Sequence, residues 1–251
     1  MQENAAIKNE PDAFNEIEAY QKPIGEHIKV LRKSILRSVI ALALAFFFII
    51  TFYSDALMQM LLEPIKARGI QFIYLGLAEA MTAQLQVSLI AAVIISSPFI
   101  FLQIWSFVKP ALYKNEKKAV LFVTLISMLL FAMGVCFGYL VVFLSSITFF
   151  VYMGENLATP MLSLSEYVGF LLGFILPFGV VFEIPVVTFV LCKVGLLQPA
   201  TLIRIRKYII LVVFIVAAFL TPPDALSQTL MALPMIALYE VGIIVAKYTC
   251  K

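Results

Sequence analysis

The chain has 251 residues, of which 63% are hydrophobic and 13% are charged. A soluble domain has about 45–50% apolar and about 25% charged residues, so this composition excludes an ordinary soluble domain. It predicts an all-α polytopic membrane protein with its charges gathered in short segments between long apolar runs. The net charge of +3 is too small to indicate a nucleic-acid partner.

The first 22 residues are acidic and contain no apolar run, so we expect a cytoplasmic tail at 1–22 before a membrane domain at 23–251. From Ile24 to Ile35, apolar residues recur at helical spacing opposite charged ones. This pattern predicts an amphipathic helix at the membrane surface. We expect that helix to continue directly into the first span.

Apolar segments predict six transmembrane helices, at 38–53, 80–107, 119–154, 167–192, 208–220 and 225–246. The third is about 50 Å long against about 30 Å of hydrocarbon, so it must tilt or project from the bilayer. Pro98 is expected to kink the second helix, and Pro177 and Pro185 to interrupt the fourth. The fifth is only about 20 Å long and Pro234 is expected to break the sixth, so this short pair predicts a locally thinned bilayer.

The lysines and arginines predict the orientation of the chain. Sixteen of the eighteen lie on one side of a six-span arrangement, which places both termini in the cytoplasm, N-in/C-in. Basic loops are expected at 103–118 and 193–207, and both lie on that side. The segment 54–79 is too polar to cross the membrane and is expected to form a structured external loop.

The segment 103–118 places four lysines around one carboxylate, Glu116. In one interpretation, Asn115 caps the following helix and Glu116 lies in its first turn, where a negative charge meets the positive end of the helix dipole. In the other, the Glu116 carboxylate is free to bind a guanidinium group of a partner. These residues alone leave both interpretations open.

Glu183 lies deep in the fourth span, where an ionised side chain costs at least ~2.5–3.5 kcal/mol. It is either a functional carboxyl or a protonated or hydrogen-bonded group that joins two helices. A functional carboxyl at this depth also suits a proton- or ion-coupled secondary transporter. Glu240 lies near the cytoplasmic end of the sixth span, with Lys247 two turns away, and is expected to be an interfacial charge.

The sequence offers little for catalysis. His27 is the single histidine, which excludes a HExxH zinc site, and neither a GxSxG elbow nor a glycine-rich phosphate loop is present. We therefore expect no enzymatic activity, no cofactor and no metal. Cys136, Cys192 and Cys250 are odd in number and lack CxxC spacing, so they predict neither a disulfide framework nor a metal site.

Three separate motifs occur in order along the chain: FLQIWSFVKPALY at 101–113 followed by Glu116, FGVVFEIP at 178–185, and LTPPDALSQT at 220–229. With them, the chain from about residue 23 onward resembles the TatC family. TatC is the multi-spanning subunit of the twin-arginine protein translocase. The resemblance implies six helices in a concave, glove-like arrangement with both termini cytoplasmic, in agreement with the orientation predicted from the charges.

The resemblance also implies roles for individual residues. Glu116 matches the loop carboxylate that receives the paired arginines of signal peptides. Phe107 and Pro110 match neighbouring loop positions, and Arg32 matches an arginine of the N-terminal motif. Positions that the family links to the external loop or to partner contact are matched by Pro64, Glu79, Glu183, Asp224 and Gln228.

The chain departs from the family pattern at one place. The N-terminal motif of the family is HLxELRxR, and residues 27–34 here are HIKVLRKS. Val30 therefore replaces a second signal-binding carboxylate and Ser34 a second arginine. Glu26 lies one helical turn before Val30 on the same face, from where it could supply the missing charge.

The sequence thus predicts a non-enzymatic signal-peptide receptor and scaffold that exports folded proteins across the bacterial cytoplasmic (inner) membrane. Its expected partners are twin-arginine signal peptides, single-span subunits resembling TatA and TatB, and further copies of itself. No nucleic acid is expected. The alternative is a secondary transporter that uses Glu183 at the membrane midplane.

Overall fold

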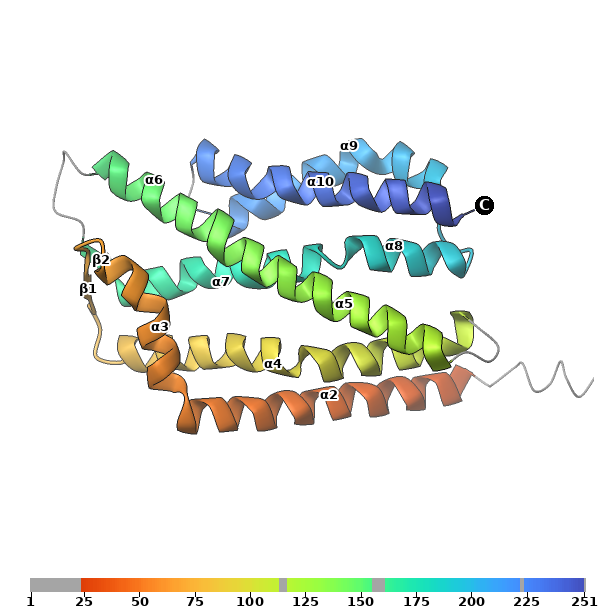
Figure 1. The fold of residues 1–251 in the computed structure, drawn as a ribbon, viewed down its shortest axis with the longest axis horizontal. Coiled ribbons are helices and arrows are strands. Elements are labelled where there is room, and N and C mark those ends of the chain that lie inside the picture. The colour runs from red at the N-terminus through yellow and green to blue at the C-terminus, as the bar shows by residue number, and fades with distance from the viewer. Residues whose placement is uncertain (1–23, 113–116, 155–160, 222–223, 251) are drawn as a thin grey trace, which may run out of the picture.

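The structure, a computed structural model, describes residues 24–112, 117–154, 161–221 and 224–250. Long helices lie side by side, and two short strands lie at one end of the bundle (Figure 1). In the described ranges, five helical segments are long and apolar enough to cross a membrane, namely Ile28–Phe52, Glu79–Phe107, Val120–Gly154, Leu164–Lys193 and Ala225–Thr249. The predicted all-helical membrane class is confirmed.

The first two spans form an antiparallel pair. Helix α2, Ile24–Phe52, is continuous, so the surface helix runs directly into the first span as predicted. It packs along α4, Glu79–Leu112, which continues through Pro98. The predicted loop at 103–118 is therefore wrong over residues 103–112, which are helical. The start of α2 and the end of α4 therefore meet at the same end of the bundle (Figure 1).

The third span is as long as predicted. Helix α5, Lys117–Phe137, continues without a gap into the π-helix η1, Gly138–Phe143, and then into α6, Leu144–Gly154. In Figure 1 this continuous segment crosses the other long helices obliquely. It packs against α4 and against the fourth span.

The fourth span is interrupted, as predicted, but between its prolines. Helix α7, Leu164–Val181, contains Pro177, and α8, Ile184–Lys193, has Pro185 in its first turn. Phe182 and Glu183 form the turn that separates the two helices. Proline is tolerated in the first turn of a helix because its missing N–H has no intrahelical acceptor there.

Two glycines let α5 and η1 lie directly on α7 beside this turn. A Cβ atom on Gly134 would lie 2.5 Å from the Phe178 carbonyl oxygen and 2.9 Å from Phe182 Cβ. A Cβ atom on Gly138 would lie 3.0 Å from the Phe174 carbonyl oxygen. Small residues four apart permit such close backbone contact between membrane helices.

The fifth helix is longer than predicted. Helix α9 is Pro199–Leu220, so the predicted start at 208 is wrong and the basic loop 193–207 shortens to the turn 194–198. Pro199 starts the helix, because its fixed φ suits a first turn. Gly195 has a φ of +77° and ends α8 in the left-handed conformation that favours glycine.

The sixth helix is neither broken nor short. Helix α10, Ala225–Thr249, continues through Pro234 over 25 residues, so the predicted break and the argument from two short helices are wrong. Gln228 before the proline and Tyr239 after it both bond carbonyl oxygens of α9, which holds α10 in place on both sides.

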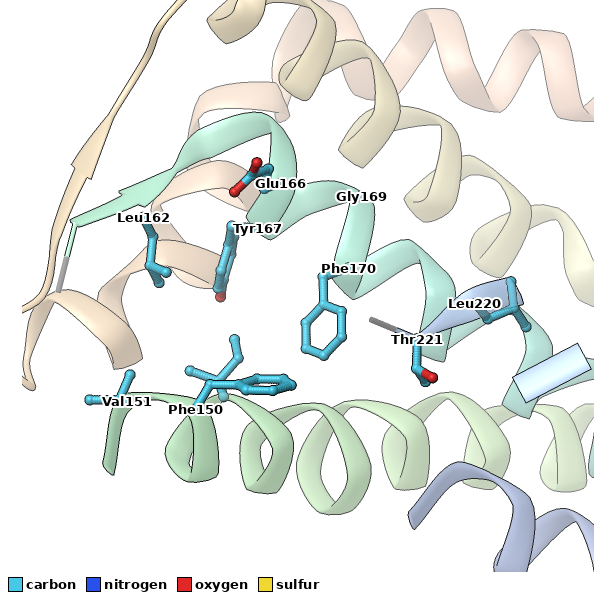
Figure 2. A pocket seen from close by; sticks show the side chains of 10 residues that line it. Phe150, Val151, Leu162, Glu166, Tyr167, Gly169, Phe170, Leu220 and Thr221 are labelled. Atoms are coloured by element: carbon cyan, nitrogen blue, oxygen red, sulfur yellow. The ribbon is translucent and has the colours of Figure 1, made fainter. Parts of the chain in front are cut away.

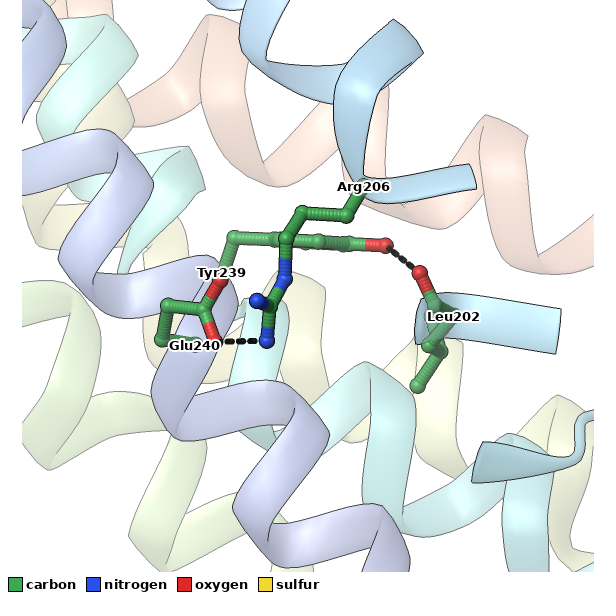
Figure 3. Close-up of polar contacts among 4 residues, drawn as sticks. All are labelled: Leu202, Arg206, Tyr239 and Glu240. Carbon is green, nitrogen blue, oxygen red and sulfur yellow. Dashed lines mark hydrogen bonds and ion pairs between the residues drawn. The ribbon is translucent and has the colours of Figure 1, made fainter. Parts of the chain in front are cut away.

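Polar contacts join α9 to α10 (Figure 3). Arg206 Nη2 lies 2.7 Å from Glu240 Oε2, and Tyr239 Oη donates a hydrogen bond to the Leu202 carbonyl oxygen at 2.8 Å. Glu240 is therefore an ion-pair partner of α9, and was not predicted as one.

The strands join two segments distant in sequence. After α3, Ser54–Lys66, strand β1, Gln71–Ile73, pairs in parallel with β2, Met161–Ser163. The structured loop at 54–79 is confirmed, although the strands themselves were not predicted. We call the end of the bundle with β1 and β2 the strand end, and the end with Cys250 the C-terminal end.

Cys192 and Cys250 form a disulfide, with their Cα atoms 5.4 Å apart. The expectation that the cysteines indicate no disulfide is therefore wrong. The two residues are 58 positions apart and have no spacing signal, and only the parallel packing of α8 and α10 brings their C-terminal ends together. Cys136 is free and exposed.

The glycine contact generates a prediction. Gly134→Ala forces a Cβ atom against the backbone of α7, so we expect a loss of about 1–3 kcal/mol of folding free energy and a lower thermal midpoint in detergent. Gly169→Ala is the matched control, because Gly169 lies in α7 with no heavy atom within 4 Å of an added Cβ. Equal midpoints for both variants would show that α5 and α7 do not pack this closely.

Candidate functional site

The residues matched to signal-peptide binding lie on elements that meet at the C-terminal end (Figure 1). Phe107 is half-buried on α4, and Arg32 is exposed on α2. Glu26 lies in the first turn of α2, one turn before the exposed Val30, although its side chain is outside the described part. Glu116 also lies outside the described residues, between the end of α4 and the start of α5.

Glu183 lies at the break in the fourth span and is 8% exposed. Neither carboxyl oxygen has a hydrogen-bond partner of good geometry among the described residues. Ser127, a fully buried side chain on α5, is close enough to interact with the carboxyl without forming such a bond. Glu183 is thus buried beside Ser127 of α5.

Ser127 also contacts α4. The indole Nε1–H of Trp105 donates a hydrogen bond to Ser127 Oγ at 2.9 Å, with both groups buried. Trp105 packs with Val186 and Val190 of α8 in one apolar cluster. Ser127 therefore lies between Trp105 of α4 and Glu183 at the break. Trp105 is two residues before Phe107.

No sequence pattern pointed to Ser127, because a serine in an apolar helix usually bonds its own backbone. Trp105, however, is the single tryptophan of the chain and lies in a recognisable motif. A buried indole N–H needs an acceptor, so a search for a polar residue on the facing span could have found Ser127. We call Trp105, Ser127 and Glu183 the polar junction.

Glu79 holds the strand end together. Its Oε2 accepts backbone N–H bonds from Leu75 and Gly76, at 2.5 and 3.2 Å. Its Oε1 accepts hydrogen bonds from Ser163 Oγ at 2.6 Å and Ser165 N–H at 2.8 Å. One carboxylate thus ties the start of α4 to β2 and to the start of α7. Glu79, which the resemblance matched to an external-loop position, therefore has a structural role.

The other matched residues also have structural contacts. Pro64 is half-buried inside α3. Asp224 Oδ1 accepts a bond from Ser227 N–H at 2.7 Å and caps α10, while its Oδ2 is buried without a partner in the described structure. Gln228 Nε2 donates to the Phe214 carbonyl oxygen at 3.0 Å and ties α10 to α9.

A cavity of about 470 Å³ lies at the strand end between α6, α7 and the end of α9 (Figure 2). Figure 2 shows the rings of Phe150, Tyr167 and Phe170 around it. Glu166 is the charged side chain of its lining, which is otherwise apolar except for Tyr167 and Thr221. In the described ranges, no three His, Cys, Asp or Glu residues gather as metal ligands do.

The geometry defines a multi-pass helical membrane protein whose polar residues join helices and loops. A model of the family described as "Sec-independent protein translocase protein (TatC)" matches residues 26–234, and the chain belongs to the TatC family. It is a component of the twin-arginine translocase and not an enzyme.

Known relatives cover nearly the whole chain. TatC of Carboxydothermus hydrogenoformans is 40% identical over 225 residues, which are 89% of this chain and 92% of that protein. TatC of Helicobacter pylori is 40% identical over 221 residues, 88% of this chain and 87% of that protein. A crystal structure titled as the twin-arginine translocase receptor TatC superposes with a TM-score of 0.83 at 34% identity, covering 90% of this chain and 100% of that one.

The predicted function as the receptor subunit of the twin-arginine translocase is thereby confirmed. The transporter alternative is not retained, because the whole match belongs to a translocase family.

The polar junction generates a prediction. Ser127→Ala leaves the buried indole N–H of Trp105 without an acceptor, so we expect a loss of about 1–3 kcal/mol in free energy of unfolding. Trp105→Phe combined with Ser127→Ala should cost less than the sum of the single variants, in chemical unfolding followed by circular dichroism. Ser146, buried on α6, is the control, and Trp105→Phe with Ser146→Ala should be additive. Additivity of the Ser127 pair would rule out the contact.

Proposed function

We propose that the chain crosses the bacterial cytoplasmic membrane six times in a concave, glove-like arrangement, with both termini cytoplasmic. Helix α9 is the additional crossing, and its uncharged part 208–220 is about 20 Å long. Three basic residues precede that part within the helix, Arg204, Arg206 and Lys207. The distribution of basic residues supports the orientation, since the C-terminal end holds the ends of the segments that are rich in them.

The observation that supports peptide binding is that α2, with Arg32, and α4, with Phe107, pack together and meet at one end of the bundle. We propose that a twin-arginine signal peptide binds there. Glu116 receives a guanidinium group, because a carboxylate accepts two parallel N–H bonds from arginine. Glu26 supplies the second negative charge that Val30 lacks, and Phe107 and Arg32 complete the face.

The first test removes the Glu116 charge. Glu116→Gln should weaken binding of a twin-arginine peptide at least about tenfold, because a hydrogen bond to a charged group is lost. Binding is measured by crosslinking peptides with paired arginines or paired lysines to the full chain in membranes. Glu63→Gln, an exposed carboxylate on α3, is the matched control.

Wild-type protein should prefer paired arginines, and Glu116→Gln should lose that preference. Glu26→Gln should weaken binding of the paired-arginine peptide, and Val30→Glu should strengthen that binding. Unchanged crosslinking by a stably inserted Glu116→Gln protein would defeat the proposed role. Equal binding by the wild type, Glu26→Gln and Val30→Glu proteins would leave Glu116 acting alone.

We further propose that Glu183 contacts a polar residue on the transmembrane helix of a single-span TatA- or TatB-like subunit. A buried carboxyl without a hydrogen-bond partner is unfavourable, so a donor from a second helix would be stabilising. Asp224 Oδ2 is unpartnered in the described structure as well, so it is proposed as a second such contact. Gln228, Pro64 and Glu79 shape the surfaces on which partners dock, and several copies associate in the complex.

Glu183→Ala should therefore still crosslink a twin-arginine peptide yet fail to export folded cargo from cells. Removal of the carboxyl abolishes the partner contact and leaves the peptide-binding end intact. Glu166→Ala, which removes an exposed carboxylate from the same span, is the control and should export normally. Normal export by Glu183→Ala would make Glu183 a purely structural carboxyl.

A further inference from the structure

A groove runs along the surface of α6 at the strand end, with a volume of about 590 Å³. Arg68, in the turn between α3 and β1, lies at this groove, and its Nη1 donates a hydrogen bond to Thr148 Oγ1 at 2.6 Å. Arginine has five N–H donors in a planar fork. The bond to Thr148 thus holds the guanidinium group at the groove while most of its donors remain to bind a ligand.

The rest of the groove is a stripe on one helical face. Leu140, Leu144, Phe149 and Tyr152 line it at spacings of four, five and three residues. Leu140 lies about 12 Å along the helix from Thr148, toward the middle of the third span. Tyr152 is 71% exposed and Leu140 is 59% exposed, so the stripe faces the surroundings of the bundle. The Arg68 guanidinium group thus lies at one end of an apolar stripe that extends into the membrane-spanning part of the helix.

The charge of Arg68 is not neutralised within the described structure, where the ion pair found is Arg206 with Glu240. The cavity on the other side of α6, lined by Ile147 and Phe150, has the opposite character, because Glu166 is its charged residue. The Arg68 groove therefore attracts an anion, whereas the Glu166 carboxylate at the neighbouring cavity repels one.

We propose that the groove binds one anionic phospholipid, with its phosphate on the Arg68 guanidinium and an acyl chain along Leu144 and Leu140. Guanidinium groups match phosphate geometry with paired hydrogen bonds. Tyr152 lies at the headgroup level, where amphipathic rings are favoured. The orientation proposed above puts this lipid in the outer leaflet, whereas the binding itself does not depend on that orientation or on the signal-peptide site.

The test is native mass spectrometry of the full chain, titrated in neutral detergent with phosphatidylglycerol or with phosphatidylcholine of the same acyl chains. Wild-type protein should retain phosphatidylglycerol in preference to phosphatidylcholine. Arg68→Gln should weaken phosphatidylglycerol binding about tenfold and abolish the preference, because the charged donor is lost. Arg68→Lys, which keeps the charge but not the fork, should fall between the two.

Lys66→Gln is the matched control, since Lys66 is an exposed basic residue of the same segment that does not line the groove. It should bind as the wild type does. Ser145→Phe fills the groove without altering Arg68, and it should weaken the binding of both lipids. The site would be overturned if the wild type retained both lipids equally, or if Arg68→Gln and Lys66→Gln lost phosphatidylglycerol binding to the same extent. Displacement of the lipid by excess inorganic phosphate would also overturn it. If Arg68→Gln fails to fold, unchanged binding by Ser145→Phe would overturn it.

Discussion

Every backbone N–H and C=O group inside the membrane needs a hydrogen-bond partner, and this requirement constrains the break in the fourth span. Across the turn, Phe182 N–H bonds the Phe178 carbonyl at 3.0 Å and Glu183 N–H bonds the Val180 carbonyl at 3.0 Å. Val187 N–H then bonds the Glu183 carbonyl at 2.9 Å, so the backbone is satisfied on both sides. Irregular backbone is tolerated at this depth only when protein covers it. The close packing of α5 and η1, through Gly134 and Gly138, supplies that cover.

That cover also explains the polar junction. The same helix that shields the turn presents Ser127 toward Glu183 and accepts the indole N–H bond of Trp105. The backbone of the break is satisfied, but the side chain at it is not. The unsatisfied carboxyl of Glu183 is the observation on which the proposed contact with a partner helix rests.

Sequence patterns predicted the features that depend on local composition. The long third span and the interruption near Glu183 follow from uncharged length and from paired prolines, and both are observed. The start of α9 was missed because charges at 204–207 suggested a loop, whereas all three lie on the helix and Arg206 pairs with Glu240 of α10. The Cys192 disulfide and the pairing of β1 with β2 connect residues far apart in sequence, and neither has a local signal.

Disulfide crosslinking can show whether a partner helix lies against Glu183, as we propose. Glu183→Cys, in a chain whose three native cysteines are serines, is combined with cysteines placed one at a time along the transmembrane helix of a single-span subunit. Val187→Cys, at an exposed position on α8, is the reference. We expect crosslinks from position 183 that recur at helical spacing around the polar residue of the partner. Crosslinks from position 187 alone, with none from 183, would contradict it.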